Sequence, residues 1–215
     1  MIKKNKKILC ITSLIILLPI LFGLLFWNKL PEPMPTHWGA DGQVDGWSSR
    51  GYAVFAIPLF LLLGHWLCIL CTTLDKKNEE QNKRVFHMVL WFCPIVSLFC
   101  YGTVYAASFG KSVETNYLVP LFLGLLFVMT GNYLPKCKQN HTIGIKVKWA
   151  LLDEENWNAT HRFAGKVWVI TGILLLASCF LGEGIVFYAC FILVFAAAIL
   201  SAGYSYYYFK KKQRR

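Results

Sequence analysis

The 215-residue sequence has few charged residues. Only 15% of its residues are charged and 56% are hydrophobic, whereas about a quarter are charged in soluble proteins. This composition excludes an ordinary soluble globule. The apolar residues also form long blocks without a short repeat, and the 16 glycines and 8 prolines are ordinary numbers, so collagen-like, disordered and solenoid proteins are excluded too. The fold class that remains is an all-α integral membrane protein.

The sequence also lacks the motifs of common catalytic sites. It contains no HExxH, no GxSxG and no glycine-rich phosphate loop, and no aspartate pair lies inside an apolar segment. A zinc site built from His141, Glu154, Glu155 and His161 is one alternative, and a capping role for His161 is the other. We predict no enzyme activity, no cofactor and no metal site.

Crossing about 30 Å of hydrocarbon takes roughly 17 to 25 helical residues. Six apolar segments are long enough, namely residues 8–27, 52–74, 85–109, 117–134, 164–181 and 185–209. The first is too long for a signal-peptide core and precedes no small-residue cleavage pattern, so we interpret it as a retained span. The fifth is the weakest, because Lys166 lies in its first turn. The fifth and sixth should form an antiparallel hairpin, since only residues 182–184 separate them.

The basic residues are distributed unevenly between alternate connections. If the amino terminus is cytoplasmic, only Lys29, Arg50 and Lys111 of the 22 Lys and Arg residues lie outside. Cytoplasmic connections are enriched in Lys and Arg in this way. We therefore predict that both termini are cytoplasmic. This topology explains the net charge of +11 without a nucleic-acid partner, so none is predicted.

The eight cysteines do not form a predicted disulfide set. Seven lie in the apolar segments and Cys137 lies in a cytoplasmic connection, so none is in an oxidising outer loop. Cys68 and Cys71 make a C-x-x-C pair inside a span, with no second pair. We predict that the cysteines act as small apolar residues.

The outer loop, residues 28–51, has three prolines that favour an extended chain, followed by a turn rich in glycine and aspartate. A calcium loop is the alternative, but its twelfth position is Tyr52 rather than Glu. The candidate residues for contact with an external partner are Thr36, His37, Trp38, Asp41, Asp45 and Trp47.

The second long connection, residues 135–166, is called the signature loop below. Gly144 allows a turn, Trp149 is suited to headgroup depth, and Asp153 is a plausible N-cap. We expect a short interfacial helix over residues 154–162, with Trp157 and His161 on one face.

Inside the spans, no Asp, Glu, Lys or Arg lies deep in the membrane, which disfavours a small-solute transporter. His65 lies near mid-membrane, level with Pro94 and close to Ser97, and we interpret it as a polar tie between the second and third spans. Gly102, Ala106 and Gly110, four residues apart, predict a close helix contact.

Two motifs resemble known families. The outer segment LPEPMPTHWGADGQVDGWSSR is similar to a short domain of unknown function (DUF1648-like) that follows the first helix in some bacterial membrane proteins. The segment from residue 131 to 166 resembles the signature of the SdpI family, the immunity proteins for sporulation-delaying toxin. The matching positions are Gly131, Asn132, Pro135, Lys136, Asn140, Gly144, Ile145, Trp149, Leu151, Trp157, Thr160, His161, Arg162 and Gly165.

The resemblance implies a DUF1648-like region over residues 1–75 and a four-span SdpI-like region over residues 76–215. It implies an immunity protein in the cell membrane of a Gram-positive bacterium, which protects against a secreted peptide toxin and in the best-known member also holds a cytoplasmic repressor at the membrane. The implied docking residues are Asn132, Asn140, Gly144, Lys146, Lys148, Trp149, Trp157, His161 and Arg162. Lys146 and Lys148 depart from the family's usual Arg and Pro, so an identical partner does not follow. A small-solute transporter, or another multi-span protein without a toxin role, is the alternative.

Overall fold

The computed structural model describes residues 2–182 and 184–214, except the side chain of residue 3. The chain divides into two compact units, each described by itself here. The first unit consists of Met1–Leu74 and Phe86–Thr115, and the second of Asp75–Val85 and Asn116–Arg215.

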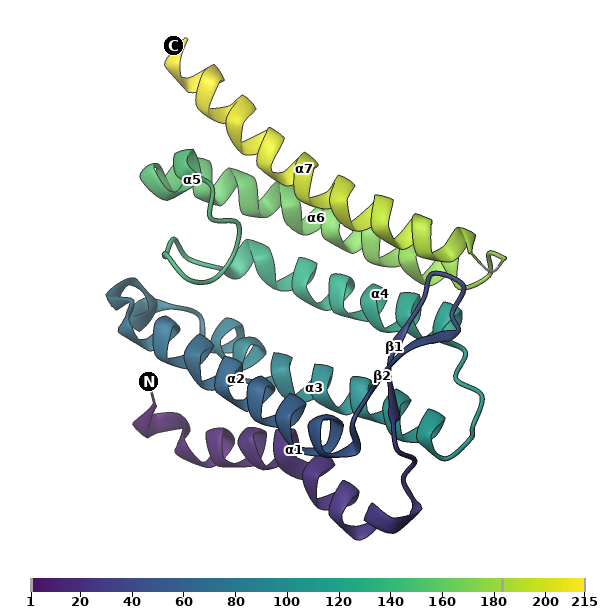
Figure 1. Cartoon of the computed structure of the whole chain (residues 1–215). Helices are drawn as coiled ribbons and strands as arrows, with labels where there is room; N and C mark the ends of the chain where they lie inside the picture. The colour runs from purple at the N-terminus through teal and green to yellow at the C-terminus, as the bar shows by residue number, and fades with distance from the viewer. Residues whose placement is uncertain (1, 183, 215) are drawn as a thin grey trace. The chain divides into compact units, whose positions relative to one another are not determined.

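The first unit contains three long helices and a small β-hairpin (Figure 1). The helices are α1 (Lys6–Leu25), α2 (Ile57–Leu74, preceded by a π-helical turn over Tyr52–Ala56) and α3 (Lys83–Ser108). The hairpin pairs β1 (Met34–Trp38) with β2 (Val44–Ser48) in antiparallel register. The strands had not been predicted, because the prolines indicated only an extended chain and a turn.

The core of the first unit joins the hairpin to the helices. Met34 from β1 packs with Ala53 and Val54 and with two tyrosines of α3. The tyrosine hydroxyls donate to backbone carbonyls, Tyr101 to Ala53 at 2.7 Å and Tyr105 to Pro19 at 2.6 Å. These bonds fix the base of the hairpin against the helix ends.

The second unit contains α4 (Thr115–Tyr133), α6 (Glu154–Ser178) and α7 (Ile185–Gln213), with the short α5 (Lys148–Leu152) before α6 (Figure 1). Helices α6 and α7 run antiparallel along each other, as expected from their short connection. The short helix expected over residues 154–162 is wrong in extent, because α6 continues unbroken into the fifth apolar segment. Asp153 does cap it, accepting from Glu155 N at 3.1 Å.

Glycines set how closely α4 and α6 approach. A Cβ at Gly124 would lie 2.9 Å from the carbonyl oxygen of Gly172, and one at Gly131 would lie 2.9 Å from that of Gly165. The two contacts are seven residues apart on each helix, so the backbones touch twice along the same face. The predicted contact through Gly102 and Gly110 is wrong, since a Cβ at either position would meet no described atom within 4 Å.

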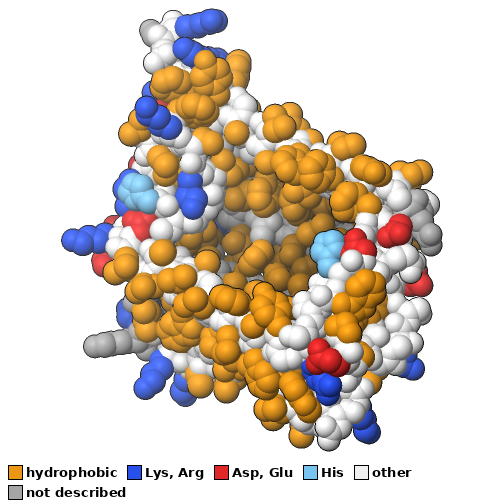
Figure 2. All heavy atoms as spheres, in the orientation of Figure 1, with side chains coloured by type: hydrophobic (Ala, Val, Ile, Leu, Met, Phe, Trp, Pro, Cys, Tyr) orange, Lys and Arg blue, Asp and Glu red, His pale blue; other side chains and the backbone are white. Residues whose placement is uncertain are grey.

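Five helices are long and apolar enough to cross a membrane in the described residues: Lys6–Leu25, Tyr52–Leu74, Lys83–Ser108, Thr115–Lys136 and Ile185–Gln213. Helix α6 is not among them, because charged residues occupy its first turns. It nevertheless runs beside α7, and the thiol of Cys179, just beyond it, donates to Tyr117 O near the start of α4 at 3.6 Å. It therefore runs beside α4, and a crossing by the fifth apolar segment stays a prediction. Hydrophobic side chains cover most of the face seen in Figure 2, as a multi-pass membrane protein requires.

Contacts within each unit show which connections share a side of the membrane. The Thr115 hydroxyl donates to Gly42 O at 3.0 Å, so the hairpin and the α3–α4 connection lie on one side. In the second unit, Asp75 accepts from His141 N at 2.7 Å, and Lys212 contacts Asp153 at 3.0 Å. The α2–α3 connection, the signature loop and the carboxyl-terminal end therefore share a side. This agrees with alternate crossings by the spans.

Candidate functional site

The candidate residues of the outer loop lie on the hairpin. His37 Nδ1 lies 2.5 Å from Asp45 Oδ1 across the two strands, and both side chains are more than half exposed. Gly46 is paired with His37 in the register, and a Cβ there would lie 2.8 Å from His37 Cβ. The glycine therefore leaves room for the histidine to reach Asp45.

The other hairpin candidates divide into supporting and exposed residues. The Thr36 and Ser48 hydroxyls are 2.9 Å apart, and Asp41 at the turn accepts from Gln43 N at 3.0 Å. Trp38 packs against the core of the first unit, whereas Trp47 is 57% exposed. Trp47, His37 and Asp45 are therefore the side chains most available to a partner.

The base of the hairpin depends on a contact between Glu32 and Arg50 that the sequence did not predict. Both carboxylate oxygens of Glu32 accept from Arg50 N at 3.1 Å, and the Arg50 guanidinium donates to Trp27 O at 2.8 Å. The guanidinium also lies over the Trp27 ring, 5.0 Å from its centroid. Arg50 thus joins the two ends of the outer loop.

The signature loop folds around two buried side chains of α6, Trp157 and His161. Their rings stack with centroids 4.0 Å apart, as their spacing of four predicts, and Trp157 Nε1 donates to Cys137 O at 2.8 Å. His161 Nδ1 lies 2.8 Å from Trp157 O, and its Nε2 accepts from Ile145 N at 3.0 Å. Since a carbonyl only accepts and an amide only donates, His161 is neutral with the proton on Nδ1.

Burial lowers the pKa of His161 to about 4, despite its hydrogen bond to the Trp157 carbonyl. Gly144 makes this arrangement possible. Its φ of +103° confirms the predicted turn, and a Cβ at this position would collide with His161 Nε2.

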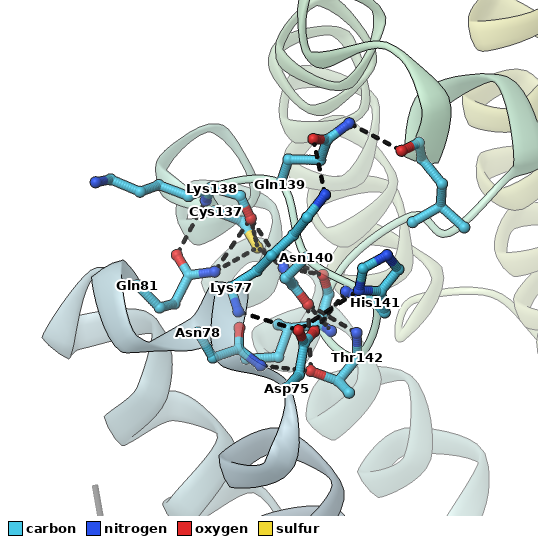
Figure 3. A network of polar contacts seen from close by, with 12 residues as sticks. Asp75, Lys77, Asn78, Gln81, Cys137, Lys138, Gln139, Asn140, His141 and Thr142 are labelled. Atoms are coloured by element: carbon cyan, nitrogen blue, oxygen red, sulfur yellow. Dashed lines mark hydrogen bonds and ion pairs between the residues drawn. The ribbon is translucent and has the colours of Figure 1, made fainter.

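Asn140 organises the start of the loop (Figure 3). Its buried amide oxygen accepts from Thr142 N and Ile143 N at 2.8 and 2.6 Å, and its amide nitrogen donates to Lys138 O and Ile143 O at 2.8 and 2.9 Å. The side chain therefore makes hydrogen bonds to four backbone groups of the loop.

The loop is also held by the connection between α2 and α3, which the sequence analysis missed (Figure 3). Gln81 accepts from Lys138 N at 2.9 Å and donates to Lys138 O at 3.1 Å, and Asn78 donates to the Thr142 hydroxyl at 2.7 Å. Asp75 is partly buried, which raises its pKa, but hydrogen bonds from the backbones of His141 and Lys77 outweigh this and lower the pKa overall. No local sequence pattern links these two distant segments.

Cys137 lies inside this network as a buried thiol, and burial raises its pKa to about 11. All eight cysteines are free of disulfides. Within residues 2–182 and 184–214, no group of three or more His, Cys, Asp or Glu side chains could hold a metal ion.

The remaining candidates lie nearer the surface. Lys146, Lys148 and Arg162 are exposed, and Asn132 is exposed at the end of α4. Trp149 packs against α7, with its ring centroid 5.2 Å from that of Tyr206, rather than standing free as an anchor at headgroup depth. The signature loop therefore presents basic side chains outside a buried scaffold.

His65 is fully buried within α2, but its partner differs from the expected one. The Thr12 hydroxyl of α1 donates to Leu9 O at 3.1 Å and lies 3.1 Å from His65 Nε2. Because that hydroxyl has one proton, His65 Nε2 is the donor. The hydrogen bond of His65 therefore joins α1 to α2, rather than α2 to α3 as predicted.

Comparison with known proteins matches both motif regions and the whole chain. A model of the SdpI/YfhL protein family matches residues 136–205, and a model of a domain of unknown function (DUF1648) matches residues 14–62. The chain is also 30% identical over 210 residues to "Immunity protein SdpI" of Bacillus subtilis (strain 168), covering 97% of each chain. The chain belongs to the SdpI family. No solved structure matches this SdpI family member.

The two matched regions coincide with the two sites described above. The DUF1648 match contains the hairpin and parts of α1 and α2, and the SdpI match contains the signature loop, α6 and most of α7. Family membership, the two motifs and the membrane-spanning helices confirm the resemblance found in the sequence.

Proposed function

We propose that this SdpI family member is an immunity protein of a Gram-positive cell membrane, which protects the cell against a secreted antimicrobial peptide. The observation that carries this proposal is the 30% identity, over 97% of both chains, to a protein named as an immunity protein. The proposed function is binding of a peptide rather than catalysis.

The proposed orientation follows from the basic residues. The side of the membrane that holds the hairpin carries Lys29, Arg50 and Lys111, and the other side carries the remaining basic residues. The bias towards positive cytoplasmic connections supports an orientation with the hairpin outside and the signature loop inside. In a cysteine-depleted background, Asp41→Cys should react with a membrane-impermeant maleimide in intact cells, and Lys210→Cys only after permeabilisation. The opposite pattern would contradict the orientation.

The hairpin is the proposed toxin-facing surface. Trp47 offers a large exposed ring, and the neighbouring His37 and Asp45 offer polar groups at an exposed strand pair. Aromatic rings beside polar groups suit an amphipathic peptide. Contact with the peptide is therefore proposed at Thr36, His37, Trp38, Asp41, Asp45 and Trp47.

Survival of sensitive cells expressing the protein, exposed to the toxin encoded beside its gene, tests this function. Trp47→Ala and His37→Ala should each reduce protection, because they remove exposed contact groups with little effect on packing. Trp38→Ala should also reduce protection, but its side chain packs on the core, so membrane abundance must be compared. Unchanged survival between cells with and without well-expressed protein would refute the immunity function.

The signature loop is the proposed docking surface for a cytoplasmic repressor. Lys146, Lys148 and Arg162 are exposed there, whereas Asn140, Gly144, Trp157 and His161 hold the loop in shape. Lys146→Gln with Lys148→Gln should weaken membrane recruitment of the neighbouring repressor more than it weakens protection, as membrane fractionation would show. Equal loss of both activities would contradict separate surfaces for toxin and repressor.

A further inference from the structure

A groove of about 880 Å³ lies on the second unit among α4, α6 and α7, and it shares Asn132 and Arg162 with the proposed docking residues. Arg162 and Lys166 line it from α6, Asn132 from the end of α4, and Tyr208 from α7. None of the lining residues is acidic. The groove therefore has a positive rim with additional hydrogen-bond donors.

The two cations of the rim have no partner among the residues that the structure describes. Arg162 and Lys166 are exposed, and neither has an ion pair or a hydrogen bond with any described residue. Their spacing of four places them on the same face of α6, about 6 Å apart along the axis. Two cations at this separation can both contact one phosphate group.

The other end of the groove is apolar. Val169 and Ile170 line it, and Ile170 is 57% exposed. Ile170 lies about 12 Å further along α6 than Arg162, in the direction of the apolar part of the helix. Gly131 and Gly165 also line the groove, at the point where the backbones of α4 and α6 touch.

We infer that this groove binds an anionic phospholipid, with its phosphate between Arg162 and Lys166 and one acyl chain along Val169 and Ile170. The occupant is a lipid because the groove combines a positive rim with an apolar continuation, and because two candidate membrane spans, α4 and α7, form its walls with α6. Basic pockets between membrane helices bind anionic headgroups in this manner. The inference rests on the membrane location alone and does not depend on toxin immunity.

Native mass spectrometry of the full chain in mild detergent, with dioleoylphosphatidylglycerol or dioleoylphosphatidylcholine added, tests the inference. The wild-type chain should retain phosphatidylglycerol in preference to phosphatidylcholine. The double variant Arg162→Gln/Lys166→Gln should bind phosphatidylglycerol about 25-fold more weakly, at about fivefold per cation. The matched control Lys210→Gln/Lys211→Gln removes the same charge from α7 outside the groove, and should change binding less than twofold.

Two further experiments distinguish a site for a lipid from a site for free phosphate. Ile170→Trp should weaken phosphatidylglycerol binding without changing charge, because the larger ring fills the acyl path. Inorganic phosphate at equal concentration should not displace the lipid. Displacement by phosphate, an unaffected Ile170→Trp variant, or equal losses in the two double variants would overturn the inference. If the rim double variant is not monodisperse, Lys166→Gln alone should still show about a fivefold loss.

Discussion

The hairpin and the signature loop use similar residue types in opposite environments. On the hairpin, the His37 side chain is 72% exposed and Trp47 is 57% exposed. In the signature loop, His161 is 1% exposed and Trp157 is fully buried. The hairpin thus offers its aromatic and polar groups to a partner, whereas the signature loop uses the same groups to hold its own backbone.

The difference shows what a family motif can mean physically. The signature residues Asn140, Gly144, Trp157 and His161 satisfy backbone groups or fill the core of the second unit, so each is needed for the loop conformation. Recognition by this loop must then come from exposed side chains around them. Substitutions should therefore act through stability in the signature loop and through binding on the hairpin.

The largest expected effect is on Trp157. Trp157→Ala removes a fully buried ring and the hydrogen bond to Cys137 O, so it should lower the free energy of unfolding by about 3–5 kcal/mol. The matched change Trp47→Ala should cost less than about 0.5 kcal/mol, because that ring is exposed. Unfolding of the purified variants in detergent measures both free energies. Similar losses in the two variants would contradict the difference between a buried signature loop and an exposed hairpin.

Acid should destabilise the signature loop through His161. Its pKa is lowered to about 4 in the folded protein, below about 6.5 in an unfolded chain, so only the unfolded chain binds a proton between these values. The contribution of His161 to the free energy of unfolding is therefore fully present above pH 6.5. It is lost as the pH drops towards 4, by about 3 kcal/mol in total.

Thermal unfolding in detergent between pH 7 and pH 4.5 measures this dependence. His161→Gln should flatten the slope. Asp153 contributes separately: burial raises its pKa, but the hydrogen bond from Lys212 and the other favourable contacts outweigh this, so its stabilisation is lost only at lower pH. A slope that persists in His161→Gln would show that another group controls acid sensitivity.

A smaller loss is expected for Asn140→Ala. The change removes the hydrogen bonds that Thr142 N and Ile143 N donate to the buried Asn140 amide, which costs about 1–3 kcal/mol. Asp41→Ala is the control on the hairpin, where the backbone bond from Gln43 N to the aspartate is exposed and water can replace it. Denaturant unfolding of the two variants should rank Asn140→Ala as the less stable, and the reverse order would contradict the scaffold role.

The smallest effect is expected for His65, which lies in one of the apolar helices rather than in the hairpin or the signature loop. His65→Leu removes one neutral hydrogen bond to Thr12 between α1 and α2, so it should cost at most about 1–2 kcal/mol and leave protection intact. Thr12→Val is the matched change on the partner helix. Complete loss of protection at normal membrane abundance would instead give His65 a functional role.

The sequence by itself predicted the features that depend on local composition. The lengths of the apolar segments predicted the positions of the long helices, because crossing the hydrocarbon layer requires an unbroken run of apolar residues. For Tyr52–Leu74 the predicted and observed bounds are identical. The short-range signals were also reliable: the spacing of four between Trp157 and His161, the cap by Asp153 and the turn at Gly144 were all confirmed.

Only the tertiary structure decided the features that depend on contacts between distant segments. The hairpin arises from pairing of Met34 with Ser48, whereas the prolines before it indicated only an extended chain. The partner of His65 was fixed by the packing of α1 beside α2, and the scaffold around Asn140 came from a connection about sixty residues earlier in the chain. A sequence pattern reports the conformation of neighbouring residues, but burial and hydrogen-bond partners are decided by which helices and loops meet in space.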